Sequence, residues 1–233
     1  MALQNTRVPK QCINCGCLSK EHSKVVKNGH QNGIQRFRCQ KCGKSFQEKY
    51  KYNAYLPNTD TNIAKLLCEG VGILGISRIL KISKNTVASR MLKIASRIEK
   101  PIWQKANCTF QMDELWTFIK NKRKNATYIT YCIEKQTGQV LGFGIGQRSY
   151  QTIRPIVEQL LKVEPKSIYT DKLAIYKSLI PHKNHKVFQF ATNKIERNNL
   201  NLRTHIKRLS RKTICYSKSE IHLEAHLKIY FWG

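Results

Sequence analysis

Two closely spaced pairs of cysteines restrict the fold of the N-terminal part of the chain. The pairs follow the pattern CxxC, and each stands beside a glycine: Cys12 with Cys15, and Cys39 with Cys42. Four thiolates at this spacing suit a tetrahedral structural zinc ion. A segment this short buries too little apolar surface to fold without the metal. We therefore predict a zinc ribbon over residues 1–48, with Cys17 near enough in sequence to compete as a ligand. A redox pair or unliganded thiols are the alternative.

A helical pattern follows the ribbon after a linker, Lys49–Pro57. Between Ile63 and Ile98 the apolar residues recur at helical spacing, and Ser83 stands where the N-cap of a third helix is expected. Three helices with a tight turn before the last are typical of a helix-turn-helix domain, here predicted over residues 58–100. The alternative is a small helical bundle that contacts no DNA. The last helix would present these residues to the major groove: Lys84, Asn85, Thr86, Ser89 and Arg90.

From residue 106 onward, short strands alternate with helices. Strands are predicted at 108–119, 126–133, 140–145, 167–170 and 186–190. Helices are predicted at 150–162, 173–179, 194–212 and 218–232. The order βββ-α-β-α-β-α is that of a ribonuclease-H-like domain. The predicted fold class is thus α+β multidomain, with the zinc ribbon and the helix-turn-helix ahead of a ribonuclease-H-like α/β catalytic domain over residues 106–233.

Acidic residues in this last part are few, and three of them are candidates for a metal site. Asp113 and Asp171 interrupt apolar strand sequences, where aspartate is disfavoured. The first and fourth strands are neighbours in this topology, so we expect Asp113, Asp171 and Glu196 to converge. Three close carboxylates require cations, and oxygen ligands favour two Mg²⁺ or Mn²⁺ ions acting on a phosphodiester. Glu114 should point to the opposite face of its strand and is the weaker candidate.

Each carboxylate also has a purely structural interpretation. Asp113 would stabilise a turn, Asp171 would N-cap the helix that follows it, and Glu196 would pair with Arg203 within its own helix. Any one of these is more common than catalysis. Their coincidence, with only nine acidic residues beyond residue 100, favours a metal site.

The helix predicted at 194–212 carries an apolar stripe and a basic surface. The stripe consists of Ile195, Leu202, Ile206 and Leu209. On the basic surface we predict DNA contacts from Arg197, Arg203 and Lys207. The whole chain has 42 Lys and Arg against 14 Asp and Glu, a formal net charge of +28. This balance indicates a nucleic-acid partner and salt-dependent binding, although structural ribosomal proteins share it.

The N-terminal sequence lacks the apolar core of a signal peptide, and no apolar run reaches the length of a membrane span. We expect a soluble intracellular protein without a membrane partner, whose cysteines are thiols or metal ligands.

Three blocks of this sequence resemble transposases of the insertion-sequence-one family. They are Met112-Asp-Glu-Leu-Trp116, Tyr169-Thr-Asp171 with Tyr176, and the long block that begins Lys194-Ile-Glu-Arg-Asn198 and runs to Lys218. The resemblance implies a DDE enzyme in which Asp113, Asp171 and Glu196 are the catalytic triad and Arg203 contacts DNA. Two positions depart from the family pattern: Lys172 replaces the usual glycine, and Asn198 replaces a common histidine. One chain carries both parts that the family often joins by fusing two reading frames.

The sequence thus predicts a transposase that binds the terminal inverted repeats of its own element and cuts and joins double-stranded DNA with Mg²⁺. Since such an enzyme holds two ends together, we expect a homo-oligomer on DNA. One rival is a non-catalytic zinc-ribbon and helix-turn-helix regulator. A second is a ribonuclease-H-type or repair nuclease that never joins strands.

Overall fold

The computed structural model describes residues 11–17, 25–47, 52–103, 106–121, 126–188 and 192–233. The chain divides into two compact units, Met1–Thr59 and Asp60–Gly233. Among the described residues, no helix has the length and apolarity needed to cross a bilayer.

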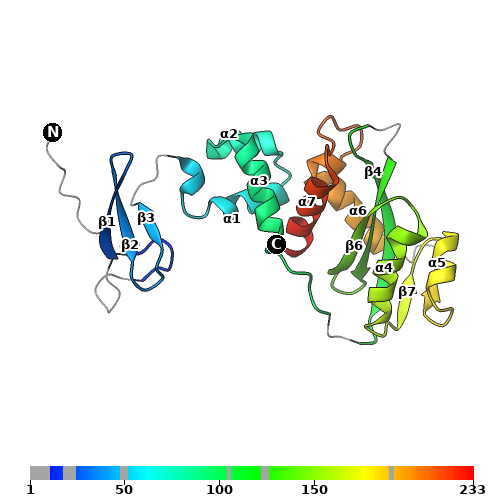
Figure 1. The fold of residues 1–233 in the computed structure, drawn as a ribbon. Coiled ribbons are helices and arrows are strands. Elements are labelled where there is room, and N and C mark those ends of the chain that lie inside the picture. Colours follow the sequence, from blue (N-terminus) through cyan, green and yellow to red (C-terminus); the bar gives the residue numbers. More distant parts are fainter. Residues whose placement is uncertain (1–10, 18–24, 48–51, 104–105, 122–125, 189–191) are drawn as a thin grey trace. The chain divides into compact units, whose positions relative to one another are not determined.

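The first unit contains a small antiparallel sheet. Its strands are β1 (Val25–Gln31), β2 (Ile34–Cys39) and β3 (Ser45–Gln47), in the order β1-β2-β3 (Figure 1). Asn32 and Gly33 join β1 to β2, both with positive φ, as a two-residue hairpin turn requires. Among the residues that the structure describes here, the buried cluster has five members: Cys12, Val25, Phe37, Cys39 and Phe46. So small a core leaves the stability of this unit dependent on its cysteines.

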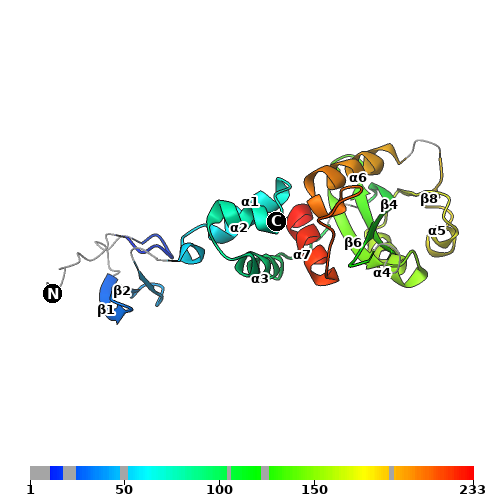
Figure 2. The same ribbon diagram turned by 90° about the horizontal axis from the view of Figure 1, so that it is seen from above.

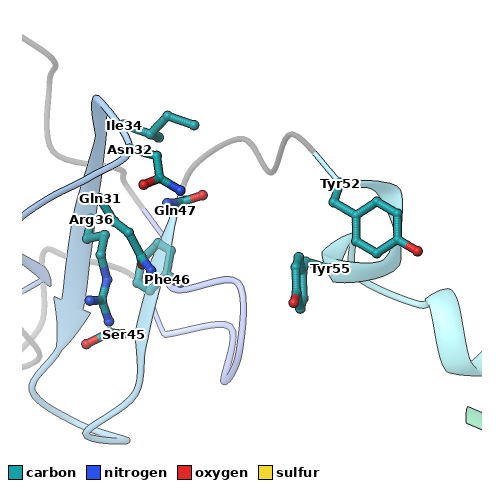
Figure 3. Close-up of a pocket in the computed structure, with 9 residues that line it drawn as sticks. All are labelled: Gln31, Asn32, Ile34, Arg36, Ser45, Phe46, Gln47, Tyr52 and Tyr55. Atoms are coloured by element: carbon teal, nitrogen blue, oxygen red, sulfur yellow. The ribbon is translucent and has the colours of Figure 1, made fainter. Parts of the chain in front are cut away.

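The predicted linker contains a short ordered turn. The 3₁₀ helix η1 (Asn53–Tyr55) buries Ala54, and the hydroxyl of Thr59 donates to Leu56 O at 2.8 Å. A hollow of about 480 Å³ in this unit is lined by strand residues, Arg36 and Phe46 among them, and by Tyr52 and Tyr55 (Figure 3). The part of the linker at 49–51 lies outside the described residues.

The second unit begins with the three predicted helices, α1 (Thr59–Cys68), α2 (Ile73–Leu80) and α3 (Lys84–Ala95). The predicted N-cap is confirmed, because the Asn85 N–H donates to the hydroxyl of Ser83 at 3.3 Å. Five residues of the predicted apolar pattern are fully buried, whereas Ile79 is 57% exposed: the buried ones are Ile63, Leu67, Ile76, Val87 and Met91.

A five-stranded mixed sheet forms the centre of the second unit. Its strands are β4 (Thr109–Phe118), β5 (Ala126–Glu134), β6 (Val140–Gly146), β7 (Ser167–Tyr169) and β8 (His185–Lys186). The order is β6-β5-β4-β7-β8, with β4 antiparallel to β5 and parallel to β7. The predicted proximity of the first and fourth strands is therefore confirmed. Because β7 pairs with β4 only as far as Gln111, no strand of the described residues flanks the second half of β4 on that side.

Helices cover both faces of the sheet. One apolar cluster joins a face to α4 (Tyr150–Leu161) and α5 (Ala174–Leu179). A second cluster joins the other face to α6 (Asn193–His205) and α7 (Glu220–Trp232). Figure 2 shows α6 and α4 on opposite sides of the sheet. Along β4 the alternation separates Phe110 and Met112, in the first cluster, from Leu115 in the second.

Two elements are shorter than the sequence predicts. The last strand ends at Lys186 rather than 190, and residues 189–191 lie outside the description. The helix predicted at 194–212 ends at His205, and η2 (Lys207–Leu209) follows an extended Ile206. The reason for this early end is tertiary: Arg203 donates to Leu209 O, and the Ser210 hydroxyl donates to Arg203 O. These bonds turn the chain back on the end of α6.

The last helix, α7, contacts two parts of its unit. It packs on β6 of the sheet and on α3 (Figures 1 and 2). The ring of His226, in α7, is buried and forms a hydrogen bond of 3.2 Å with Leu67 O of α1. Close by, the Cys68 thiol donates to Ile229 O. The α7 helix therefore ties the three-helix segment to the sheet.

This joint makes the stability of the second unit sensitive to acid. Burial, aided by the charge of Arg208, lowers the pKa of His226 from 6.5 to about 4. Below pH 6.5 the His226 imidazole is protonated in the unfolded chain but stays neutral in the folded chain. Stability is therefore lost as pH falls from 6.5 to about 4. The loss amounts to about 3 kcal/mol of the free energy of unfolding.

The expected result is a steep fall in the free energy of unfolding between pH 7 and pH 4.5, measured by urea denaturation followed by circular dichroism. In the variant His226→Gln, which keeps a donor for Leu67 O, this fall should be smaller. His182→Gln, an exposed matched control, should behave as the wild type. An identical pH profile for His226→Gln and wild type would refute this role for His226.

Candidate active site at the open edge of the sheet

Three carboxylates meet where β4 loses its neighbour β7. Each of Asp113, Glu114 and Asp171 places a carboxylate oxygen within 4.8 Å of the other two. Asp113 and Glu114 follow the last β4 residue that pairs with β7, and Asp171 stands two residues beyond the end of β7. The parallel register of the two strands thus brings their acidic residues together, as the sequence predicts for Asp113 and Asp171.

Asp113 is held from the side of α6. Its Oδ2 accepts a hydrogen bond of 2.6 Å from the amide of Asn199, and its Oδ1 accepts one of 2.7 Å from the Glu114 N–H. Despite these bonds, burial raises the pKa of Asp113, and the negative charges of Asp171 and Glu196 add to the effect. The position therefore disfavours an isolated negative charge and favours a neighbouring cation.

Glu114 belongs to this cluster, although the sequence makes it the weaker candidate. Its side chain does leave β4 on the opposite face, where the Tyr176 hydroxyl of α5 donates to Oε1. Yet its carboxylate reaches the other two, because no strand flanks β4 here and side chains from both faces can bend around the edge. The side chain is only 1% exposed. Burial, with the charges of Asp171 and Asp113, raises its pKa.

Arg148, in the segment between β6 and α4, supplies positive charge to this cluster. Its guanidinium lies 2.9 Å from Glu114 Oε2 and 2.8 Å from Asp171 Oδ2. The other oxygen of Asp171 accepts a hydrogen bond of 2.9 Å from the Leu173 N–H. The structural interpretation of Asp171 as the N-cap of α5 is wrong, because the N-cap is Leu173 and no side chain caps the helix. Two carboxylates thus share one guanidinium.

Glu196 lies outside this group of three. It is exposed in the first turn of α6, and its Oε1 accepts a hydrogen bond of 2.8 Å from the Thr192 hydroxyl. It lies one helical turn before Asn199, which binds Asp113, and its charge contributes to the raised pKa of Asp113. Its predicted partner Arg203 instead donates to Leu209 O and Trp116 O.

Buried polar side chains fix α6 over the site. The Oε1 of Gln111, a buried residue of β4, accepts the Ile195 N–H at 3.0 Å and so satisfies one of the free donors at the N-terminus of α6. The Tyr131 hydroxyl donates to Asn199 Oδ1 at 2.7 Å. A chain from Tyr131 through Asn199 to Asp113 thus sets the distance between the helix and the carboxylates.

The donor set fits a divalent metal ion. Three clustered carboxylates offer only hard oxygen ligands, which Mg²⁺ and Mn²⁺ prefer, and neither thiolate nor imidazole belongs to the cluster. The raised pKa values of Asp113 and Glu114 indicate that a positive charge at this position would be stabilising.

The four predicted cysteines also gather in one cluster, within the first unit. The sulfur of Cys12 lies 3.8 Å from that of Cys42, and Cys15 lies 3.8 Å from Cys39. A tetrahedral zinc ion with bonds of about 2.3 Å holds its sulfur ligands about 3.8 Å apart, so the cluster fits zinc. Cys17 is closer, 3.1 Å from Cys15 and 3.3 Å from Cys39, a spacing tighter than a tetrahedral edge.

The predicted DNA-contacting residues fall into two groups. Lys84, Asn85 and Ser89 are exposed on α3, whereas Arg90 pairs with Asp60 at 2.5 Å. Arg197 is exposed on α6, and Lys207 is exposed on η2 instead of continuing that helix. Thr86 is half-buried on α3, and Arg203 is bound to backbone carbonyl groups.

Comparison with known proteins identifies the family. A family model described as IS1 transposase matches residues 106–230, which include the three carboxylates and all of α6. The chain belongs to the IS1 transposase family. It is 38% identical over 113 residues to the insertion element iso-IS1n protein InsB of Shigella dysenteriae, covering 48% of this chain and 86% of that protein. To the insertion element IS1 2 protein InsB of Escherichia coli (strain K12) it is 31% identical over 119 residues, covering 51% and 69%.

Among solved structures, the chain is similar to one in the Drosophila P element transposase strand transfer complex. The TM-score is 0.36 with 12% identity, over 64% of this chain and 43% of that chain. Family membership alone makes this chain an insertion-sequence transposase.

The sequence did not indicate Arg148 as a residue of this site, and it ranked Glu114 below the other carboxylates. Glu114, Arg148, Tyr176 and Asn199 all contact the carboxylate cluster. A signal for Glu114 was present, since it stands beside Asp113 in a chain that is poor in acidic residues. Arg148 lies in a chain with 42 Lys and Arg, where one more cation is inconspicuous.

Proposed function

We propose that this IS1-family transposase cleaves and joins DNA strands with Asp113, Asp171 and Glu196 as its catalytic triad. The observation that carries the proposal is the approach of Asp113 and Asp171 at the open edge of β4, with Glu196 on the helix that Asn199 anchors to Asp113. The strand order with β4 at the centre and helices on both faces agrees with a ribonuclease-H-like domain over residues 106–233.

Asp113 and Asp171 would hold two Mg²⁺ or Mn²⁺ ions, with Glu196 completing the ligand set. Such ions supply an activated water or 3′-hydroxyl and stabilise the leaving oxygen of the phosphodiester. The chain orients the ligands: Asn199 fixes one oxygen of Asp113, and the Leu173 N–H fixes one oxygen of Asp171. Glu114 is a fourth carboxylate, whose role is to hold Arg148 beside Asp171. A non-catalytic regulator has no use for this arrangement.

The N-terminal parts would bind the terminal inverted repeats of the element. Residues 1–48 are proposed to form a zinc ribbon, since four cysteines gather there at the spacing of zinc ligands. Residues 58–100 are proposed to form a helix-turn-helix that presents the exposed start of α3 to the major groove. The net charge of +28 predicts strong salt dependence of binding. A homo-oligomer on DNA is proposed because two ends must be joined to one target.

The test is a strand-transfer assay with the full chain and labelled duplexes that carry the element's own ends. Nicking at the 3′ ends and joining to a target duplex are expected in Mg²⁺ or Mn²⁺ and should stop in EDTA. Binding of the ends without nicking in either metal would support the regulator instead. Nicking of RNA–DNA hybrids or branched DNA without joining would support a nuclease.

A further inference from the structure

A second feature lies along the same open edge of β4, beyond the carboxylates. A pocket of about 660 Å³ is lined by β4 residues that include Trp116 and Phe118, and by residues of α6, η2 and the segment after it. Trp116 follows Glu114 by two residues on the same face of β4, a separation of about 7 Å along the strand. The pocket therefore adjoins the proposed catalytic site.

The walls of this pocket are held by hydrogen bonds. Arg203 donates to Trp116 O at 3.2 Å on the β4 side and to Leu209 O at 3.0 Å on the η2 side. The hydroxyl of Thr213 donates to Lys207 O at 3.1 Å. Just beyond the end of β4, Ile119 forms a parallel β-bridge with Ser217. The pocket is thus framed by β4 and by a folded-back segment, with Arg203 as the tie between them.

The lining combines aromatic surface with positive charge. The rings of Trp116 and Phe118 lie 5.9 Å apart, and Tyr216 continues the row 5.2 Å from Phe118. Four of the ten lining residues are cationic and none is acidic: Arg203, Arg208, Arg211 and Lys212. Arg211 and Lys212 are exposed at the rim. Aromatic faces stack on nucleobases, and guanidinium and ammonium groups bind phosphates, so this lining matches a nucleotide.

A large apolar side chain stands next to the rim. Ile214 follows the lining residue Thr213 and is 91% exposed. Proteins that unstack DNA insert such apolar side chains between base pairs. An extruded base leaves a gap in the stack of the size that an isoleucine side chain fills.

We propose that this pocket receives one unstacked nucleotide of the DNA held at the carboxylates, and that Ile214 occupies the gap it leaves in the duplex. The base stacks on Trp116, and its phosphates lie against Arg211 and Lys212. The proposal rests on the proposed function in taking DNA as the ligand, and it adds a residue set that distorts DNA beside the cutting site. Extrusion of this kind exposes a strand to chemistry that a stacked duplex hinders.

The experiment measures the affinity of the full chain, without added Mg²⁺, for two probes by fluorescence anisotropy. One probe is a short DNA duplex with a single unpaired adenine nucleotide, and the other is the same duplex fully paired. The wild type should bind the first about tenfold more tightly, since the unpaired base stacks without the cost of opening a pair. Trp116→Ala should abolish this preference, and Trp116→Phe, which keeps an aromatic face, should retain it.

Ile214 is tested on the paired duplex alone. Ile214→Ser should weaken binding about fivefold, because insertion of the apolar side chain is lost. Ile102→Ser is the matched control, since Ile102 is 87% exposed and lies outside the pocket. Neither change should alter folding, so a loss confined to Ile214→Ser supports the proposal. Equal affinity of the wild type for both probes, or a full preference in Trp116→Ala, would overturn it.

The two proposals fail separately. Asp113→Asn should keep the preference for the unpaired nucleotide, because the carboxylate does not line the pocket. A preference for the unpaired nucleotide without strand cleavage by the wild type would overturn the proposed function and would leave the proposal for the pocket unaffected. Cleavage and joining without any preference would overturn the pocket alone.

Discussion

Asp113→Asn and Asp171→Asn are each expected to lower metal-dependent nicking and joining by about 10³-fold or more, with binding of the element's ends unchanged. Each change is nearly isosteric and removes one negative charge from a cluster whose oxygens lie within 4.8 Å of one another. The amide oxygen of the introduced Asn keeps one acceptor, for the Asn199 amide at position 113 or the Leu173 N–H at position 171, and the second acceptor of each carboxylate is lost. With one bond retained at each position, the fold should persist. The loss therefore reports the missing carboxylate.

The measurement is single-turnover strand transfer in Mg²⁺ and in Mn²⁺, with end binding determined in parallel. Glu158→Gln is the control, because Glu158 is exposed on α4. Within the part of the chain that the structure describes, its ion pair is with Arg154. This variant should match the wild type. Joining by Asp113→Asn within a few fold of the wild type would refute the assignment of this residue.

Removal of zinc is expected to unfold the first unit and leave the second folded. Among the described residues of this unit, the buried cluster has five members, two of which are cysteines, so we expect metal binding to supply most of the folding free energy. Structural zinc contributes about 10–16 kcal/mol in small zinc domains, more than this core can replace. Cys39→Ser should have the same effect, because it removes both a ligand and a buried cluster member.

Zinc content and hydrogen exchange of residues 25–47 measure this effect. The wild type should hold one zinc ion per chain and protect β2 from exchange, and both should be lost in Cys39→Ser. Cys17→Ser is the matched control: its sulfur lies outside the group of four, so zinc should stay. Loss of zinc in Cys17→Ser with retention in Cys15→Ser would show that the ligand set is different.

The approach of Asp113 and Asp171 was predictable because it depends on strand order alone. The sequence pattern predicts each strand, and the topology makes the first and fourth strands neighbours. The membership of Glu114 in the cluster was not predictable from the alternation of side chains between the two faces of β4. The rule of opposite faces assumes a strand with partners on both sides, and β7 ends before this residue. Only the pairing register shows that both faces of β4 open onto one edge.

The C-terminal elements show a different limit of the sequence. The apolar spacing of Ile195, Leu202, Ile206 and Leu209 agrees with one long helix, and all four residues are buried. The end of α6 is nonetheless set by the hydrogen bonds of Arg203 and Ser210, which no local pattern contains. For α7 a signal existed, because apolar residues on all of its sides indicate burial between two partners. Those partners prove to be the sheet and α3.

The assignment of the third catalytic carboxylate is the central claim, and strand joining by Glu196→Gln compared with Glu114→Gln tests it most directly. Both changes remove one charge near Asp113 and preserve side-chain size. The account predicts that Glu196→Gln loses joining completely, whereas Glu114→Gln retains about a tenth of it, because Gln can still bond to Tyr176 although it no longer holds Arg148 by charge. Joining by Glu196→Gln together with complete loss in Glu114→Gln would contradict the account and make Glu114 the third ligand.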